Sequence, residues 1–314
     1  MPASSYRRLP LVPLITGACL ILLAGCGNTP DSGSGSDAAQ HPAAASAVPV
    51  VASTNVYGDI AERIGDGKVQ VTSIIGDPDQ DPHSYEANTQ NQLALSKAKV
   101  VIENGGGYDD FVDRMLKSGG SSAEVVNAVK VSGKTAPAGG ELNEHVWYDF
   151  PTVARLADRI AAALAKADPA DAAAFGRNAK SFEAKLKPLQ EKEARIRADH
   201  GGERVAITEP VPLYMIEAAG LENATPEEFS EAIEEGGDVS ARTLQETLVL
   251  FTGKEVKALV YNEQTSGPQT EKAEQAARDA GIPVVPVTET LPHGKDYLGW
   301  MTANVDALAS ALAK

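Results

Sequence analysis

From residue 48 to the C-terminus, short runs of β-branched residues alternate with longer stretches in which apolar residues recur every three or four positions. Such runs are typical of buried strands, and the longer stretches are typical of helices that turn one face to a core. Strands are predicted at residues 48–52, 69–75, 99–102, 124–126, 204–207, 256–261 and 283–287. Helices are predicted at about residues 57–64, 88–98, 109–116, 152–166, 211–219, 240–252, 270–280 and 297–313. This alternation predicts parallel sheets covered by helices on both faces.

A stretch of different character, residues 169–198, separates the first four predicted strands from the last three. It is rich in Ala, Lys, Glu, Arg and Leu, its large apolar residues have near-helical spacing, and Gly201-Gly202 provides a stop. We therefore predict one long helix that joins two lobes, although an amphipathic helix belonging wholly to one lobe would show the same pattern. Pro188 lacks a backbone donor and crowds the preceding turn, so a kink or a break is expected near Ala184.

The predicted fold class is α/β, with two lobes that each contain a mostly parallel sheet flanked by helices and that are joined by a long rigid helix. The expected organisation is a first lobe at residues 48–168, a connecting helix at 169–200 and a second lobe at 201–314. The roughly 265 residues from Val48 onward are enough for two domains.

The first 25 residues have the charged, apolar and small-residue order of an export signal. Arg7 and Arg8 precede an apolar run of about 15 residues, which is shorter than the roughly 20 residues that cross a bilayer core. The run ends in Leu-Ala-Gly-Cys, which resembles the lipobox of bacterial lipoproteins and implies that Cys26 is the lipidated first residue of the exported chain. An ordinary cleaved signal with a chance cysteine is the alternative.

Residues 26–47 have the composition of a flexible tether, because Gly, Ser, Asp, Ala and Pro predominate and large apolar residues are nearly absent. Cys19 lies within the predicted signal, and the chain has 2 cysteines in all. We therefore expect no disulfide and no thiolate ligand in the exported part, so that any metal would be held by nitrogen and oxygen.

The charge balance argues against one class of partner. The chain has 43 Asp and Glu residues against 28 Lys and Arg residues, which gives a formal net charge of −15. Cleavage of the predicted signal would remove Arg7 and Arg8 and make the net charge more negative. Nucleic-acid phosphates need a basic face, so no nucleic-acid partner is expected.

Two histidines and two glutamates are candidate metal ligands. His83 and His145 each follow a carboxylate closely, in Asp81-Pro82-His83 and Glu144-His145. Glu209 and Glu289 each follow a predicted strand of the second lobe. In open parallel sheets, ligands bind beyond the carboxyl ends of the strands. If the four side chains converge, they form a divalent-metal site between the two lobes.

Taken in order behind a lipobox, these segments resemble the metal-binding lipoproteins of bacterial ABC importers for zinc and manganese, the cluster A-I solute-binding proteins. Asp81-Pro82-His83 looks like the family's Asp-Pro-His segment, and Asn143–Asp149 resembles its Asp-Pro-His-x-Trp-Leu segment with Asn-Glu in place of Asp-Pro. Glu209 stands where zinc-type members usually have a histidine and manganese-type members a glutamate. Glu289 stands where the family has a carboxylate, usually aspartate. The resemblance implies that His83, His145, Glu209 and Glu289 bind the metal.

The ligand set leaves the choice of metal open. Two imidazoles with two carboxylates suit higher coordination numbers and harder ions such as Mn²⁺, whereas Zn²⁺ is held in tetrahedral sites and binds almost any such set more tightly than Mn²⁺ does. Mn²⁺ and Zn²⁺ are both expected to bind, and Fe²⁺ is a third candidate.

The resemblance also implies a role without catalysis. The protein would be exported, anchored by the lipid on Cys26 to the outer face of the cytoplasmic membrane, monomeric, and would deliver the ion to the membrane permease of an ABC importer. Asp81 and Glu144 are further candidates: they either accept a hydrogen bond from the histidines and orient them, or only cap loops. His293, four residues past Glu289, is the alternative candidate for the position of Glu289.

Two other classes of function stay open. A metallohydrolase would need an open coordination position and a separate general base, a role for which Glu144 is available, but four protein ligands leave little room for water. A surface-tethered adhesin or interaction lipoprotein with a structural metal would need an exposed binding surface, which the sequence does not reveal.

Overall fold

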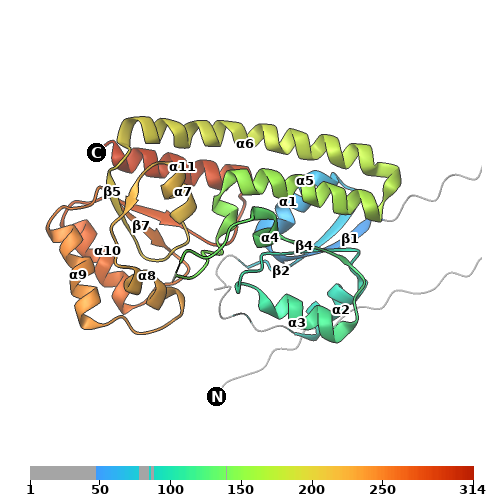
Figure 1. Ribbon diagram of the computed structural model, residues 1–314, viewed down its shortest axis with the longest axis horizontal. Coiled ribbons are helices and arrows are strands. Elements are labelled where there is room, and N and C mark those ends of the chain that lie inside the picture. The colour runs from blue at the N-terminus through green and yellow to red at the C-terminus, as the bar shows by residue number, and fades with distance from the viewer. Residues whose placement is uncertain (1–46, 78–84, 86–87, 139) are drawn as a thin grey trace, which may run out of the picture. The chain divides into compact units, whose positions relative to one another are not determined.

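The computed structural model describes residues 47–77, 85, 88–138 and 140–314. They belong to one compact unit, Ser46–Lys314, which contains two sheets of four parallel strands each. The first sheet has the order β2-β1-β3-β4 and the second has the order β6-β5-β7-β8 (Figure 1). The strands are β1 (Val48–Thr54), β2 (Val69–Ile75), β3 (Val100–Glu103), β4 (Glu124–Asn127), β5 (Arg204–Ile207), β6 (Glu222–Asn223), β7 (Leu259–Asn262) and β8 (Val284–Val287).

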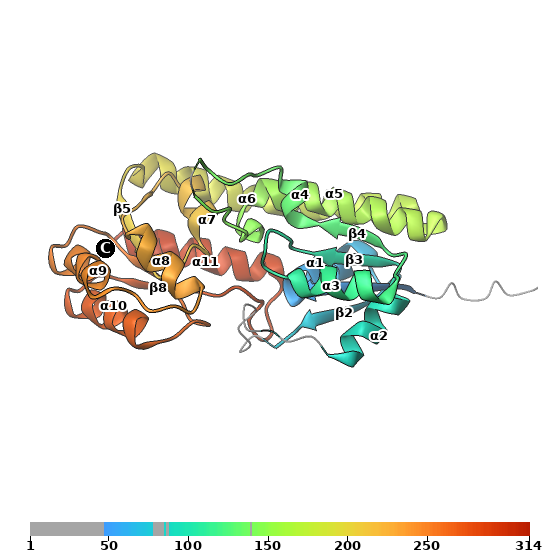
Figure 2. The same cartoon turned by 60° about the horizontal axis from the view of Figure 1, so that its bottom comes forward.

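Helices cover both faces of the two sheets (Figures 1 and 2). They are α1 (Asn55–Gly65), α2 (Thr89–Lys97), α3 (Asp110–Gly119), α4 (Ala128–Ser132), α5 (Phe150–Ala167), α6 (Ala172–His200), α7 (Leu213–Ala218), α8 (Glu227–Glu234), α9 (Ala241–Thr252), α10 (Pro268–Asp279) and α11 (Tyr297–Leu312), with short 3-10 helices η1 (Val146–Tyr148) and η2 (Pro169–Asp171). None of the helices in the described part of the chain is both long and apolar enough to span a membrane.

Successive side chains along each strand face opposite sides of the sheet, and each side is covered by its own layer of helices. In β1, Val50 and Ala52 face a core shared with α1 and α5, whereas Val51 faces a second core formed with α2 and α3. The central strand β1 pairs with two parallel neighbours, so that Val50 lies beside Val71 and Val100. A strand buried on both faces has to be apolar throughout, which is why these strands read as continuous Val and Ile runs. The predicted α/β class is confirmed.

The second sheet is built in the same way. Ile207 and Val260 face the core that contains α6, α7 and α11, while Ala206 and Leu259 face a separate core formed with α8, α9 and α10. The core that contains α6 extends without interruption from the first sheet to the second. The two lobes therefore share one apolar interior along the long helix.

Helix α6 connects the lobes, as Figure 1 shows along its upper edge. Its N-terminal half contacts the first lobe, where Asn178 donates a hydrogen bond to the carbonyl of Ile64 in α1. Its C-terminal half contacts the second lobe, where Arg197 donates to the carbonyls of Glu217 and Ala218 beside α7. Helix α6 therefore packs against both lobes and joins them.

Of the kink or break predicted near Ala184, the break does not occur, because α6 is continuous from Ala172 to His200 with Pro188 inside it. Pro188 and Ala184 are both exposed. The Ala184 carbonyl that loses its helical donor therefore lies on the side of the helix that water can reach.

The upper parts of the lobes are joined by side-chain contacts to backbone groups. Asn55 at the start of α1 donates to the carbonyl of Leu291 (3.2 Å) and accepts from its N–H (2.9 Å), and Asp59 accepts from the N–H of Tyr297 (3.0 Å). The hydroxyl of Tyr297 donates in turn to the carbonyl of Trp147 (2.6 Å). These bonds hold the segment after β8 against the first lobe.

Elements α4, β6 and α8 were not predicted from the sequence. Strand β6 has two residues, and α4 has five. Helix α8 has eight residues, of which only Phe229 and Ile233 are large apolar groups in the core. Segments this short carry too few apolar positions to show a period.

Buried Glu193 on α6 generates a stability prediction. Its side chain is 4 % exposed, and its Oε1 has no hydrogen-bond partner among the described residues. Burial, assisted by the nearby charge of Asp149, raises its pKa to about 8. A raised carboxyl pKa makes the folded protein lose stability as the pH rises from about 4.5, the ordinary value, to about 8. Glu193→Gln should therefore match wild type near pH 5 and be more stable at pH 9 by on the order of 2 kcal/mol.

Thermal or urea unfolding of the metal-free protein at both pH values measures this difference. Glu191→Gln on the exposed side of the same helix is the matched control and should behave as wild type. A Glu193→Gln variant whose stability tracks wild type at both pH values would contradict the raised pKa.

Candidate metal centre

His145 lies at the centre of a polar cluster between the lobes. It immediately precedes η1, and its side chain is fully buried. Asn143 sets its orientation: the side-chain Oδ1 contacts the imidazole Nδ1 at 2.7 Å and also accepts from the His145 backbone N–H at 3.1 Å. The asparagine amide is itself oriented, because its Nδ2 donates to the carbonyl of Pro210 at 3.1 Å.

This arrangement determines the tautomer of His145. Since Asn143 Oδ1 can only accept, Nδ1 has to carry the hydrogen. In the neutral ring, Nε2 then presents a lone pair, which is the form in which histidine binds metals.

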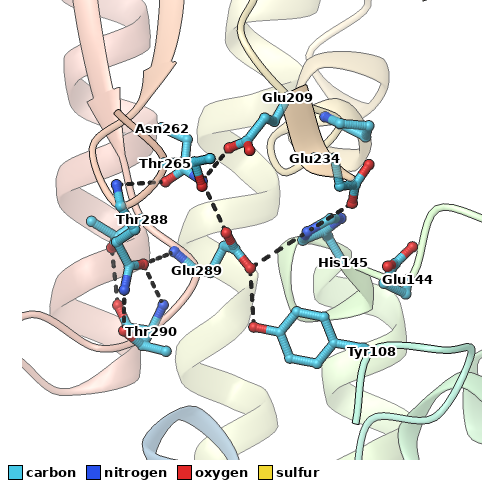
Figure 3. A network of polar contacts seen from close by, with 12 residues as sticks. Tyr108, Glu144, His145, Glu209, Glu234, Asn262, Thr265, Thr288, Glu289 and Thr290 are labelled. Carbon is cyan, nitrogen blue, oxygen red and sulfur yellow. Dashed lines mark hydrogen bonds and ion pairs between the residues drawn. The ribbon is translucent and has the colours of Figure 1, made fainter. Parts of the chain in front are cut away.

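The atoms that face Nε2 are carboxylate oxygens (Figure 3). Glu234 Oε1 lies 3.6 Å away and Glu289 Oε2 lies 3.8 Å away. A lone pair and two carboxylates repel one another unless a proton or a metal ion lies between them. Burial alone lowers the pKa of His145, but the negative charges of Glu289, Glu234 and Glu144 outweigh it and raise the pKa. The cluster thus favours a positive charge at Nε2.

Glu209 and Glu289 each lie two residues beyond the carboxyl end of a strand, β5 and β8, and these two strands flank β7. Asn262, the last residue of β7, joins the two side chains: its Nδ2 donates to Glu209 Oε2 and, at 2.9 Å, to Glu289 Oε1. All three residues are at most 2 % exposed. Figure 3 shows both carboxylates on the same side of Asn262 as His145.

The remaining oxygen of Glu209 is available to a cation. Its Oε1 is buried and accepts no hydrogen bond within the described part of the chain. Burial, and then repulsion by Glu289, raise the pKa of Glu209 to about 8. A carboxyl group that is buried beside another without full hydrogen bonding gains most from a bound cation.

Each lobe supplies one further polar contact to Glu289. The hydroxyl of Tyr108, in the segment between β3 and α3, donates to Glu289 Oε2 at 3.1 Å. Gln264, just after β7, accepts from the backbone N–H groups of Glu289 (2.5 Å) and Thr290 (3.1 Å) through its Oε1. The loop that carries Glu289 is therefore held from both sides.

The loop before Tyr108 also anchors the His145 segment. Gly105, Gly106 and Gly107 have positive φ angles of 75°, 74° and 108°. A Cβ on Gly105 would lie 2.2 Å from the Asn127 side chain. This close turn places Asn104, whose Nδ2 donates to the carbonyl of Glu144 at 3.0 Å. The glycine run is therefore a close-approach turn that supports the His145 segment.

The structure brings His145, Glu209 and Glu289 into one cluster. His83 and Asp81 lie outside the described residues, as does Cys26. The imidazole contacts Asn143 through Nδ1, so Glu144 does not take the orienting position suggested for it; its carboxylate instead lies within 4.8 Å of the ligand atoms of His145 and Glu234. His293 is exposed and lines a separate groove with Asn55.

Glu234 was missed by the sequence reasoning because α8 was not predicted. The available signal was Glu234-Glu235-Gly236-Gly237, an acidic pair at a helix stop where basic residues are the rule. The uncharged partners Asn143, Asn262 and Tyr108 were missed as well, because their side chains gain their roles only from their position beside charged groups.

A cavity of about 450 Å³ adjoins the cluster. Among the described residues, six glutamates line it: Glu141, Glu144, Glu227, Glu231, Glu234 and Glu235. This concentration of negative charge attracts cations and repels anions.

Replacement of Asn143 tests how the histidine is oriented. Asn143→Ala removes the acceptor that fixes the imidazole tautomer and should weaken divalent-metal binding about 10- to 100-fold. Isothermal titration with Mn²⁺ and Zn²⁺ measures the change. Asn178→Ala, which also removes a half-buried asparagine that donates to a backbone carbonyl, should leave the affinity unchanged. Equal affinities for Asn143→Ala and wild type would contradict the orienting role.

Comparisons with known proteins place this chain in a family. Residues 50–311 match the family model described as zinc-uptake complex component A, periplasmic. The chain is 30 % identical over 266 residues to the manganese-binding lipoprotein MntA of Bacillus subtilis, with 82 % of each chain covered. It is 26 % identical over 286 residues to the manganese ABC transporter substrate-binding lipoprotein ScaA of Streptococcus gordonii, covering 84 % of this chain and 89 % of that one.

Among solved structures, the periplasmic zinc-binding protein TroA from Treponema pallidum superimposes with a TM-score of 0.72 at 21 % identity, covering 85 % of this chain and all of TroA, which shows the shared fold. The chain therefore belongs to the family of the periplasmic zinc-uptake complex component A, and the resemblance to metal-binding solute-binding proteins indicated by its sequence segments is confirmed.

Proposed function

We propose that this protein is an extracytoplasmic solute-binding lipoprotein that captures a divalent transition-metal ion and delivers it to the membrane permease of an ABC importer. The observation that carries the proposal is the buried Nε2 of His145 from the first lobe, which faces Glu289 Oε2 from the second lobe at 3.8 Å. Two ligands of one ion have about this spacing when each lies about 2.0–2.2 Å from it. Direct hydrogen bonds would be shorter.

The proposed ligands are His83 and His145 from the first lobe, residues 48–168, and Glu209 and Glu289 from the second lobe, residues 201–314. For His145, Glu209 and Glu289 the support is their convergence and burial. For His83 the support is its sequence segment, Asp81-Pro82-His83. Two neutral imidazoles and two carboxylates balance the charge of a divalent ion.

Mn²⁺ and Zn²⁺ are the ions proposed to bind at this site, with Fe²⁺ as a third candidate. The names of the relatives include both manganese- and zinc-binding proteins. Glu209 and Glu289 are hard oxygen donors, which favours Mn²⁺, while the two imidazoles also suit Zn²⁺.

The proposed mechanism is capture and handover without catalysis. An ion held by ligands of both lobes keeps the cleft closed, so release requires one set to withdraw. The second-lobe pair is the one that moves, because Asn262 ties Glu209 to Glu289 and makes them withdraw together. Docking of the permease across both lobes would drive this step. The lipid on Cys26 keeps the monomeric protein at the outer face of the cytoplasmic membrane, near the permease.

Metal titration of ligand variants tests the site. The purified protein should bind one equivalent of Mn²⁺ or Zn²⁺, and His145→Ala, Glu209→Ala and Glu289→Ala should each weaken binding by more than about 100-fold, beyond the effect expected of an outer partner. Elemental analysis and competition titration measure both quantities. His200→Ala, which removes a histidine at the far end of α6, is the control and should bind as wild type. The proposal would be falsified if wild type bound no stoichiometric metal or if His145→Ala bound normally.

Growth under metal limitation tests delivery. A strain that lacks the protein should grow poorly in metal-depleted medium and recover when wild type, but not His145→Ala, is returned. Normal growth of the deletion strain, together with loss of surface attachment, would support the adhesin alternative instead.

A further inference from the structure

We infer that Glu234, at the end of α8, is a fifth protein ligand of the same metal site and biases that site toward Mn²⁺ over Zn²⁺. This inference rests on the proposed function. It concerns a residue of the second lobe that is separate from the segments carrying Glu209 and Glu289.

The distances place Glu234 in the ligand sphere. One ligand atom each from Glu144, His145 and Glu234 lie within 4.8 Å of one another, and Glu234 Oε1 is closer to His145 Nε2 than Glu289 Oε2 is. At 3.6 Å, this oxygen and this nitrogen are too far apart for a strong direct hydrogen bond. An ion about 2.0–2.2 Å from each would fit between them at an open ligand–metal–ligand angle.

The tautomer of His145 supplies an independent argument. Asn143 Oδ1 accepts a hydrogen bond from the Nδ1–H of His145. The lone pair on Nε2 of the neutral ring is therefore directed toward the Glu234 and Glu289 oxygens. The same lone pair faces both carboxylates. An ion coordinated by Nε2 and Glu289 is therefore also within reach of Glu234.

The local setting of Glu234 disfavours a carboxylate unless a cation is near. Glu234 is the last residue of α8, and the last turn of this helix contains no basic residue. The carbonyl groups at a helix C-terminus carry partial negative charge, which repels carboxylates and attracts cations. Glu231 and Glu235 add to this repulsion in the same cavity. Residues that break a local rule in this way are typical of functional sites.

Glu234 also differs from the other ligands in exposure. Its side chain is 15 % exposed and lines the cavity of about 450 Å³, while the side chains of His145 and Glu289 are 0 % and 1 % exposed. Glu234 therefore contacts both the buried imidazole and the space through which an ion would arrive.

A fifth ligand changes the preference for metals. Zn²⁺ in a protein site is satisfied by four tetrahedral ligands, whereas Mn²⁺ prefers more ligands and oxygen donors. An additional carboxylate oxygen therefore stabilises bound Mn²⁺ more than bound Zn²⁺.

Competition titration of Glu234→Gln with both metals tests this inference on the purified protein. The Mn²⁺ affinity should fall about tenfold or more, and the Zn²⁺ affinity less than about threefold, so that the ratio of the two shifts toward zinc. Glu231→Gln removes the same charge from the same helix and cavity, and should leave that ratio within about twofold of wild type.

Three outcomes would overturn the inference: unchanged Mn²⁺ binding by Glu234→Gln, equal losses for both metals, or the same shift in Glu231→Gln, which would indicate a field effect of net charge. Unfolding of the metal-free variants checks that each is folded. Failure of the proposed function is distinguishable, because it appears as absent metal binding in wild type or normal binding in His145→Ala.

Discussion

The main physical constraint on this structure is the negative charge of several carboxylates buried around one imidazole nitrogen. This charge has to be compensated. Glu209 and Glu289 are nearly inaccessible to solvent, Glu234 is close to them, and His145 Nε2 is directed at two of the three. Burying several anions without a matching cation costs several kcal/mol per ion. Protonation offsets part of this cost, which is why the pKa of Glu209 rises to about 8 and that of His145 also rises. A divalent cation offsets it more completely.

The fold makes this concentration of charge possible because strands and the loops tied to them position each charged side chain. Three adjacent parallel strands, β5, β7 and β8, end together and deliver Glu209, Asn262 and Glu289 to one edge. The His145 segment comes from the other lobe and is tied to the second by Asn143, which reaches the Pro210 carbonyl next to Glu209. Helix α6 packs against both lobes on the side away from these loops and strand ends.

Side-chain hydrogen bonds also join the two lobes around this cluster. Asn262 donates hydrogen bonds to both Glu209 and Glu289, and Tyr108 of the first lobe donates one to Glu289. Two residues farther along the chain, the backbone N–H of Leu291 donates to Asn55 of the first lobe. These links are individual side-chain hydrogen bonds, whereas the continuous apolar core lies along α6. Disrupting the former costs far less than disrupting the latter.

The sequence by itself determined the parallel α/β architecture and the long helix, because strand and helix periods are local properties. It also singled out Glu209 and Glu289 from their place after predicted strands, and His145 from the Glu144-His145 segment. The Val and Ile runs at β1, β3 and β5 and the charged helix at α6 were recognisable without a structure. Only the tertiary structure decided that Pro188 is accommodated within α6, that Asn143 contacts the His145 Nδ1, and that Glu234 lies beside His145 Nε2. These features depend on which side chains from distant segments become neighbours, and a short helix such as α8 carries too little periodic signal to place its last residue beside a histidine some ninety positions earlier in the chain.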